Sequence, residues 1–308
     1  MVCPYCESEE TQEKGEASTY GANVCPNCGG GVPLEQYTSA MICPYCSTSL
    51  IVDEKVQDEY RPRRILPFQM GKEACKNLMK ERFGKVLFAP TDFCSEARLD
   101  GIRGEYVPYW LYDYDTTASF IGEGTKVRVW RTGNIEHREV SYYSIRREMD
   151  GEYRMVPADA SVRMPDDVMN LIEPYDYSRF VDFTPEYMSG FNSEVYNMPS
   201  AEIEDRAKAK VHKSVEGLIQ NSYAGYSTTK TISMRINFQN ADASYCLLPV
   251  WIYDYSYKDK KFPFYVNGQS GKIVGQVPIS MSKAFAYSGT LFVSLSAIIG
   301  MILYLIKG

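Results

Sequence analysis

The sequence of 308 residues is poor in the side chains and motifs that mark common enzymes. It contains only 2 histidines, and neither His137 nor His212 lies in a metal-binding or triad motif. It has no phosphate-binding loop, because Gly122-Glu-Gly-Thr-Lys126 departs from the spacing that such a loop requires. Acidic pairs such as Asp166-Asp167 are more typical of solvated loops than of catalytic carboxylates. We therefore predict no catalytic residues and no enzymatic activity.

An apolar run is missing from the first residues, which begin with Cys3-Pro-Tyr-Cys6. This absence predicts a chain without a secretory signal peptide, in a reducing compartment where cysteines stay free or bind metal. Basic residues are also scarce in this part of the chain. Residues 1–55 contain eight acidic residues and two lysines, whereas the remainder contains 31 acidic and 31 basic residues. An acidic N-terminal region argues against nucleic-acid binding.

The sequence is rich in cysteine, and three Cys-Pro-x-Cys pairs lie within its first 46 residues. Two of these pairs, separated by 14 residues, have the spacing of a zinc ribbon, in which two tight knuckles close one tetrahedral site. Free thiols, a redox pair or an iron–sulfur cluster are the alternatives, but a redox pair normally occurs once, at the start of a helix. We predict one structural Zn²⁺, in a ribbon over residues 23–52, bound by Cys25, Cys28, Cys43 and Cys46.

The first pair, Cys3 and Cys6, has no second pair of its own. It could instead join the first knuckle of the ribbon, but the second knuckle would then lose its partner. We treat it as a half-site for a second metal ion. The remaining cysteines stand alone among apolar residues and are predicted to be core thiols: Cys75, Cys94 and Cys246.

The C-terminal segment Ala284–Ile306 contains 23 residues without a charge, between Lys283 and Lys307. A helix of this length can cross a hydrocarbon core of about 30 Å, and Tyr287 and Tyr304 lie where aromatic side chains prefer the interface. A buried core helix is the alternative, which the length disfavours. We predict one span of the cytoplasmic membrane. Several lysines precede it, so the soluble part is predicted to face the cytosol.

The region 65–280 predicts an α+β fold, after a charged linker over residues 53–64. Lys72–Phe83 has the pattern of an amphipathic helix, with Cys75, Leu78, Met79 and Phe83 on one face. Glu202–Ser222 predicts a second helix, whose buried face comprises Ile203, Ala207, Val211, Val215 and Leu218.

Short strands are predicted from Ile102 to Val156, where glycines interrupt alternating patterns. Within this stretch Asp150-Gly151 predicts a hairpin turn, and Gly122–Lys126 predicts a turn before a strand over Lys126–Arg131. A last pair of strands has Asn267-Gly268 near its turn.

An aromatic motif occurs twice, over Tyr106–Asp115 and Leu247–Ser256. Both copies contain proline, then tryptophan two residues later, then an aliphatic residue and Tyr-Asp-Tyr. A predicted helix precedes each copy and an apparent hairpin follows it, so we infer two related antiparallel-sheet halves. Trp110, Tyr112 and Tyr114 alternate and should share one sheet face. Chance similarity of two aromatic strands is the alternative.

Together these motifs resemble a bacterial family of TFIIB-type zinc-ribbon membrane proteins, the YdjG-like proteins. The resemblance extends from Asn23 onward and rests on seven motifs: Cys25-Pro-Asn-Cys-Gly29, Ile42-Cys-Pro-Tyr-Cys46, Leu66-Pro-Phe68, Val107-Pro-Tyr-Trp-Leu-Tyr112, Gly122-Glu-Gly-Thr-Lys126, Leu248-Pro-Val-Trp251 and Asn267-Gly-Gln-Ser-Gly-Lys272. It implies a membrane component that works beside SPFH-domain proteins in phage-shock-type envelope stress. Relatives can carry an additional complete ribbon at the N-terminus, of which this chain retains only Cys3 and Cys6.

The sequence thus predicts a zinc ribbon, an α+β region of two related halves, and a transmembrane helix. The function we expect is a non-enzymatic adaptor that recruits a protein partner, an SPFH-type scaffold, to the membrane. Small residues such as Ser296 and Gly300 would allow the helix to pack in a homo-oligomer. The alternatives are a nucleic-acid-associated factor, as the family designation "primosomal replication helicase-like" suggests, or a hydrolase with an unrecognised site.

Overall fold

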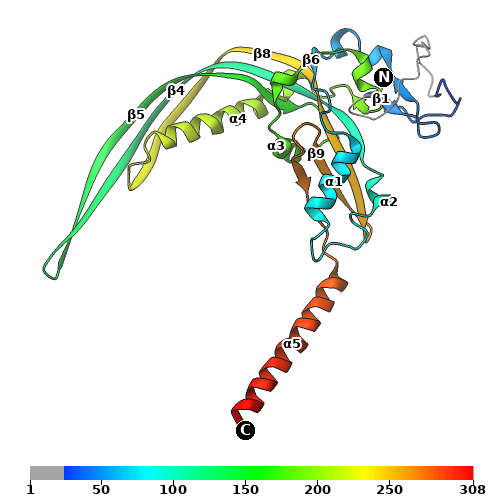
Figure 1. Cartoon of the computed structure of the whole chain (residues 1–308). Coiled ribbons are helices and arrows are strands. Elements are labelled where there is room, and N and C mark those ends of the chain that lie inside the picture. The colour runs from blue at the N-terminus through cyan, green and yellow to red at the C-terminus, as the bar shows by residue number, and fades with distance from the viewer. Residues whose placement is uncertain (1–23, 308) are drawn as a thin grey trace.

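The computed structural model describes residues 24–307 and shows a mixed α+β protein (Figure 1). One large sheet follows the order β10-β9-β8-β4-β7-β1-β2, β5 pairs with β4, and β3 pairs with both β6 and β8. The strands are β1 (Thr38–Ile42), β2 (Ser49–Ile51), β3 (Arg64–Ile65), β4 (Arg103–Thr132), β5 (Ile135–Asp159), β6 (Val181–Asp182), β7 (Asn192–Glu194), β8 (Thr228–Tyr257), β9 (Lys260–Asn267) and β10 (Ile273–Gly275). The helices are α1 (Lys72–Phe83), α2 (Glu96–Leu99), α3 (Asp166–Ile172), α4 (Ser200–Asn221) and α5 (Met281–Lys307).

Three long strands, β4, β5 and β8, extend from the body of the molecule as an arched arm (Figure 1). The prediction of short strands was therefore wrong. β4 continues through Gly122–Lys126, and β5 continues through Asp150-Gly151 in register with β4. The β4–β5 turn instead contains Gly133, whose φ is +62°.

The glycines inside these strands provide room for neighbouring side chains rather than turns. A Cβ on Gly124 would lie 2.7 Å from the ring of Tyr226. Gly151 lies opposite Thr116, whose hydroxyl donates a hydrogen bond of 3.0 Å to the Gly151 carbonyl oxygen. A glycine in a strand often marks such a close approach. The sequence pattern did not distinguish this use of glycine from a turn.

Helix α4 covers the concave face of the arm (Figure 1). It confirms the helix predicted at Glu202–Ser222 and packs on Tyr112 and Tyr114 of β4. The prediction was wrong for Leu218, which is 53% exposed. The buried face keeps a four-residue spacing along the whole helix, and Ile219 occupies the last position: Ile203, Ala207, Val211, Val215 and Ile219.

Helix α1 lies beside the C-terminal parts of β8 and β9, with the bounds predicted from the sequence. Cys75 and Met79 are buried in a cluster that also contains Phe68, Trp251 and Tyr253, and Leu78 and Phe83 pack against it. In this cluster and in the one beneath α4, one amphipathic helix therefore packs against each copy of the aromatic motif.

The two copies of the motif pair with each other at the centre of the sheet. β4 and β8 run antiparallel, and Val107 pairs with Leu248, the residue at the corresponding position of the other copy. A short parallel strand flanks each copy at the same point: β7 pairs with Glu105 and Tyr106, and β3 pairs with Cys246 and Leu247. The two copies therefore have the same strand environment.

The two motif tryptophans also make the same contact. The Trp110 indole N–H donates to the carbonyl oxygen of Met198, at 3.1 Å, and the Trp251 indole N–H donates to that of Met70, at 3.0 Å. Each methionine lies two residues before a helix, α4 and α1 respectively. Each tryptophan thus fixes the start of the helix that covers its sheet face.

Residues 24–52, the four-cysteine unit, are attached to the edge of this sheet. β1 pairs antiparallel with β7, where Thr38 lies opposite Glu194 and Ala40 opposite Ser193. Residues 53–64, predicted as a linker, include two short 3₁₀ helices and the buried Val56. The four-cysteine unit therefore extends the main sheet.

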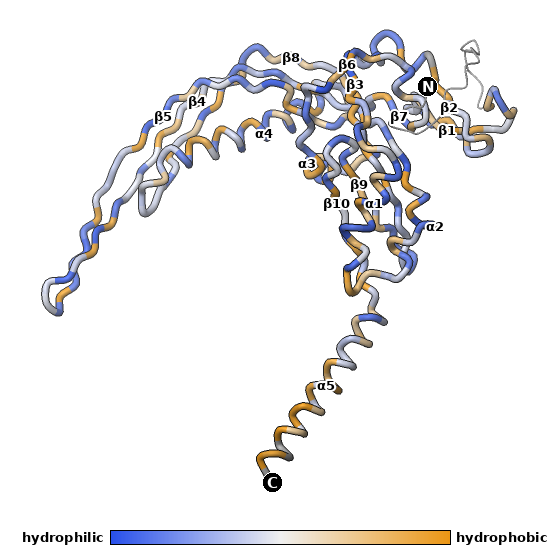
Figure 2. The backbone as a smooth tube through the Cα atoms, viewed as in Figure 1, coloured by the Kyte–Doolittle hydropathy of each residue, from blue (hydrophilic) through white to orange (hydrophobic). Residues whose placement is uncertain are grey.

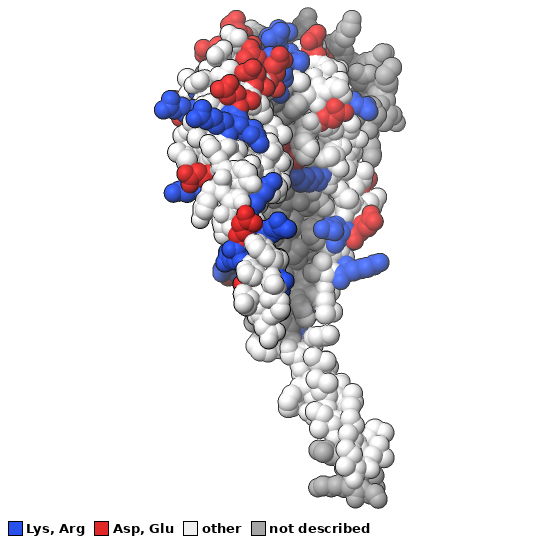
Figure 3. All heavy atoms as spheres, turned by 90° about the vertical axis from the view of Figure 1, so that its left-hand side faces the viewer, with Lys and Arg blue, Asp and Glu red and all other residues white. Residues whose placement is uncertain are grey.

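Helix α5 projects from the body and makes few contacts with it (Figure 1). Its segment Met281–Ile302 is long and apolar enough to cross a membrane, and none of its hydrophobic window is buried in the protein. Figure 2 shows α5 as a largely hydrophobic helix, and Figure 3 shows no charged side chain along its length below the body. Unlike α1 and α4, this helix leaves most of its apolar side chains uncovered by the described part of the protein.

Candidate metal centre

The two cysteine knuckles have the same backbone turn. In the first, the Cys25 amide donates to the Gly30 carbonyl oxygen and the Gly29 amide donates to that of Cys25, each at 2.8 Å. In the second, the Ser47 amide donates to the Cys43 carbonyl oxygen at 3.0 Å. The residue after each second cysteine is left-handed, with φ of +71° at Gly29 and +59° at Ser47. Each turn therefore directs two sulfurs to one side.

The four predicted ligands converge on one point. The Sγ atoms of Cys25 and Cys46 are 3.6 Å apart, and those of Cys28 and Cys43 are 3.8 Å apart. All four sulfurs lie within 4.8 Å of one another. A tetrahedral zinc ion with Zn–S bonds of about 2.3 Å separates its sulfur ligands by about 3.8 Å. The four cysteines can therefore hold a metal ion such as zinc.

The pKa values of these thiols also bear on cation binding, because thiolates rather than thiols bind metals. A hydrogen bond with Thr48 lowers the pKa of Cys46 to about 6. The Gly30 amide lowers the pKa of Cys28, but desolvation and the three neighbouring thiols outweigh it and raise that pKa to about 12. Four thiolates in such proximity repel one another. A divalent cation removes this repulsion and allows all four to act as ligands.

The core of the four-cysteine unit is very small. Its buried residues are Cys25, Val32 and Cys43, against which Leu34, Met41, Cys46 and Leu50 pack in part. Two of the three buried residues are themselves predicted metal ligands. So small an apolar core cannot offset the conformational entropy of folding, and a metal ion bound by the four cysteines would supply the missing stability.

The other cysteines lie away from this site or outside the described residues. Cys3 and Cys6, the predicted half-site, fall outside the described residues. Cys75 and Cys246 are buried core thiols as predicted, and burial raises the pKa of Cys75 to about 12. Cys94 is half-buried, with its Sγ 3.7 Å from the Met79 carbonyl oxygen.

A cleft at the joint between the four-cysteine unit and the sheet was not predicted from the sequence. It has a volume of about 170 Å³ and includes Arg163 in its wall. The Arg163 guanidinium lies 3.3 Å from the Glu35 carboxylate and 3.5 Å from that of Glu194. Glu194 is buried, accepts a short hydrogen bond from Ser161, and has a pKa raised by burial. Arg163 therefore holds the four-cysteine unit to the sheet by charge.

The histidines do not join the metal centre. His137 stacks on Trp130, with ring centroids 5.2 Å apart, near the end of the β4–β5 hairpin. His212 is exposed on α4. Asp166 pairs with Arg206 at 2.9 Å. The structure thus places these three residues in separate, locally explained settings.

Comparison with known proteins gives one informative relationship. No model of a known protein family matches the chain, and no solved structure matches it. The chain is 30% identical over 237 residues to "Uncharacterized protein YdjG" of Bacillus subtilis (strain 168). The alignment covers 77% of this chain and 70% of YdjG. The zinc-ribbon designation of the family stays a prediction, but the extent of the match establishes the relationship itself: the chain belongs to the family of YdjG.

Proposed function

We propose that the protein is a non-enzymatic adaptor that holds a protein partner at the cytoplasmic membrane. The main support is that the chain carries a four-thiol site at the edge of the sheet and, at its other end, an apolar helix that is not buried in the protein. A metal with four protein ligands has no open position for chemistry, so it serves to stabilise a surface. Anchoring that surface to a membrane raises the local concentration of a shared partner.

The anchor in this proposal is α5, with residues 1–283 in the cytosol. Basic residues flanking a span stay on the cytoplasmic side, and five lysines precede this one: Lys258, Lys260, Lys261, Lys272 and Lys283. The cytosol also keeps the metal-binding thiols reduced. Deletion of residues 284–308 should release a soluble protein. Digestion of the four-cysteine unit by protease added outside intact cells would contradict this orientation.

The partner in this proposal is an SPFH-type membrane scaffold that acts in envelope stress, as the family resemblance implies. The four-cysteine unit offers a contact for it at Tyr45, whose side chain is 70% exposed. The ring of Tyr45 packs against the backbone of Gly30, where a Cβ would lie only 2.7 Å away. A tyrosine fixed in this way is well suited to be a binding hot spot.

The α+β region in this proposal consists of two related halves. The matching strand neighbours and tryptophan contacts of the two aromatic motifs support this idea. In this arrangement the helix before each motif covers the strands of the other half, because α1 packs with Trp251 and α4 packs with Tyr112. The result is a rigid platform between the metal centre and α5.

The test compares partner localisation in cells that carry the wild type, Cys25→Ser/Cys28→Ser, Tyr45→Ala or the control Cys94→Ser. We expect the double variant to lose metal and to release the partner from the membrane, while this chain remains there. Tyr45→Ala should retain metal and still weaken partner binding. Cys94→Ser removes a thiol outside the metal centre and should have no effect. A partner that stays at the membrane in all four cell lines would contradict the proposal.

A further inference from the structure

The loop between α1 and α2 lies against the first turns of α5. The Ser280 amide donates to the Phe88 carbonyl oxygen at 2.7 Å, and the Lys283 ammonium donates to that of Ala89 at 2.7 Å. The rings of Phe88 and Tyr287 meet edge to face, with centroids 5.6 Å apart. The loop is thus joined to α5 by backbone and side-chain contacts.

This loop extends alongside the part of α5 that has no charged residues. Leu87 and Phe88 line a groove together with Tyr287 and Thr290. The uncharged segment begins at Ala284, so Thr290 lies about 9 Å along the helix from its start. A membrane that encloses α5 must therefore also surround the loop at the depth of the lipid interface.

The side chains at the end of the loop are apolar and project away from the protein. Leu87 is 57% exposed and Val86 is 41% exposed. Lys85 precedes them and is also exposed. Two neighbouring apolar side chains next to a lysine and an aromatic residue match the composition of segments that lie at a lipid interface.

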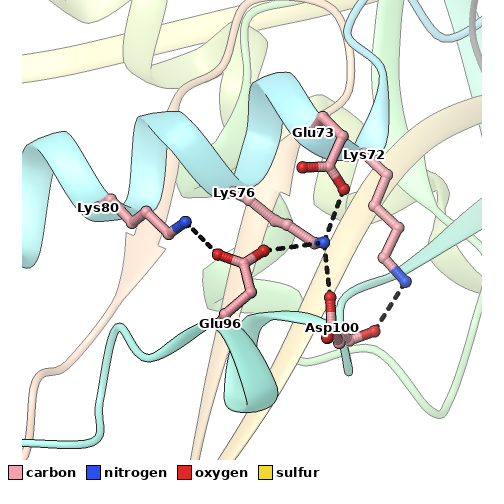
Figure 4. Close-up of polar contacts among 6 residues, drawn as sticks. All are labelled: Lys72, Glu73, Lys76, Lys80, Glu96 and Asp100. Carbon is pink, nitrogen blue, oxygen red and sulfur yellow. Dashed lines mark hydrogen bonds and ion pairs between the residues drawn. The ribbon is translucent and has the colours of Figure 1, made fainter.

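The base of the loop is held rigidly, so its position relative to α5 is defined. The buried Lys76 ammonium lies 2.6 Å from both Glu73 and Asp100 and 3.3 Å from Glu96 (Figure 4). Glu96 also accepts a short hydrogen bond from Lys80, so it joins α1 to α2 across the loop.

The far side of the loop is tied to β8. The Tyr253 hydroxyl donates to the Phe93 carbonyl oxygen, and the Tyr255 hydroxyl donates to the Asp92 carboxylate, each at 2.7 Å. Both ends of the loop are thus fixed, and the exposed Val86 and Leu87 lie between them.

We propose that Lys85–Phe88 is a second membrane contact, in which Val86 and Leu87 insert into the lipid interface beside α5. The inference rests on the proposed anchoring by α5. Its occupant is the phospholipid of the same bilayer, because the loop adjoins the helix that enters it. With two contacts, the body cannot rotate freely on its anchor, and the four-cysteine unit keeps a defined orientation above the membrane.

The experiment uses the full chain in phosphatidylglycerol–phosphatidylethanolamine vesicles whose acyl chains carry bromine, which quenches tryptophan fluorescence on contact. Leu87→Trp tests the loop. Phe292→Trp, at an exposed position within α5, reports on the span, and Ile232→Trp, exposed on β8, reports on the arm. We expect brominated lipid to reduce the added emission of Leu87→Trp and Phe292→Trp by at least about twofold, and to leave that of Ile232→Trp unchanged.

The variants separate failure of this inference from failure of the proposed anchor. If Phe292→Trp is quenched and Leu87→Trp behaves like Ile232→Trp, the loop contact is overturned while the anchor stands. If neither Phe292→Trp nor Leu87→Trp is quenched, the membrane anchor is overturned as well. Because Leu87 is exposed, its substitution should not disturb folding.

Discussion

The four-cysteine unit buries three side chains, two of them predicted metal ligands, whereas the neighbouring sheet buries continuous clusters of aromatic and aliphatic residues on both of its faces. The two regions share hydrogen bonds through β1 and β7, but they are stabilised differently. The sheet depends on apolar burial, whereas we expect the unit to depend on thiolate–metal bonds. Removal of a metal should therefore destabilise the four-cysteine unit and leave the sheet to which it is joined intact.

The largest expected effect is the loss of metal from Cys43→Ser. Metal binding contributes on the order of 10 kcal/mol to the folding of so small a unit. The variant should bind no zinc and lose the structure of residues 24–52, while wild type binds close to one zinc per chain. Metal analysis of the purified protein measures this. Unchanged zinc content in Cys43→Ser would remove these cysteines as ligands.

The next largest effect concerns packing against the sheet, compared at a buried and an exposed position of α4. Ile219→Ala should lower the free energy of unfolding by about 2–5 kcal/mol, because Ile219 is buried, whereas the exposed Leu218→Ala should change it by less than about 0.5 kcal/mol. Denaturant unfolding of the two variants gives both values. Zinc content should be unaffected in each. Equal destabilisation by the two would mean that α4 is rotated from the position described.

The stability of the two regions should change with pH in opposite directions. Burial raises the pKa of Asp159 to about 6, above its ordinary value of 3.8, so the folded sheet binds this proton more tightly than the unfolded chain. The contribution to stability is therefore complete below about pH 4 and falls by roughly 3 kcal/mol as the pH rises through 6. The four-cysteine unit should do the opposite and lose metal as its thiolates are protonated in acid.

Asp159→Asn and the exposed Asp205→Asn provide the control for this titration. In Asp159→Asn the free energy of unfolding should change little between pH 4 and 6, whereas in Asp205→Asn it should change as in the wild type. Unfolding monitored by the near-ultraviolet signal of the sheet aromatics measures both. If Asp159→Asn keeps the full pH dependence, another group is responsible for it.

The smallest expected effect compares the two motif tryptophans. Trp110→Phe and Trp251→Phe each remove one indole hydrogen bond to a methionine carbonyl oxygen. Each should cost about 1 kcal/mol, plus the loss of some packing, and the two values should be similar. Thermal unfolding provides the comparison. A large effect in only one copy would show that the two motifs do not support their helices in the same way.

Much of the fold could be predicted from local patterns, and the errors have a common cause. The cysteine spacing indicated which four cysteines lie together, and the apolar periodicity indicated α1 and α4. Gly122, Gly124 and Gly151 were misread as turn residues because each also adjoins a residue distant in sequence, namely Lys230, Tyr226 and Thr116 respectively. The length of β4 and β5 was missed for the same reason.

The joint between the two regions could not be predicted at all. Glu35 and Arg163 are 128 positions apart in the sequence, and nothing local identifies them as partners. The pairing of β1 with β7 likewise depends on a three-residue strand inside a segment with no clear pattern. Local sequence therefore indicated the metal site but not what it is attached to.

Hydrogen exchange on the wild-type chain, before and after addition of a zinc chelator, tests whether a metal stabilises the four-cysteine unit and not the rest of the sheet. We expect backbone amides in Thr38–Ile42 and Ser49–Ile51 to lose protection when the metal is removed, while those in β4 and β8 keep theirs. Unchanged protection in the four-cysteine unit, or loss of protection throughout the sheet, would contradict this expectation.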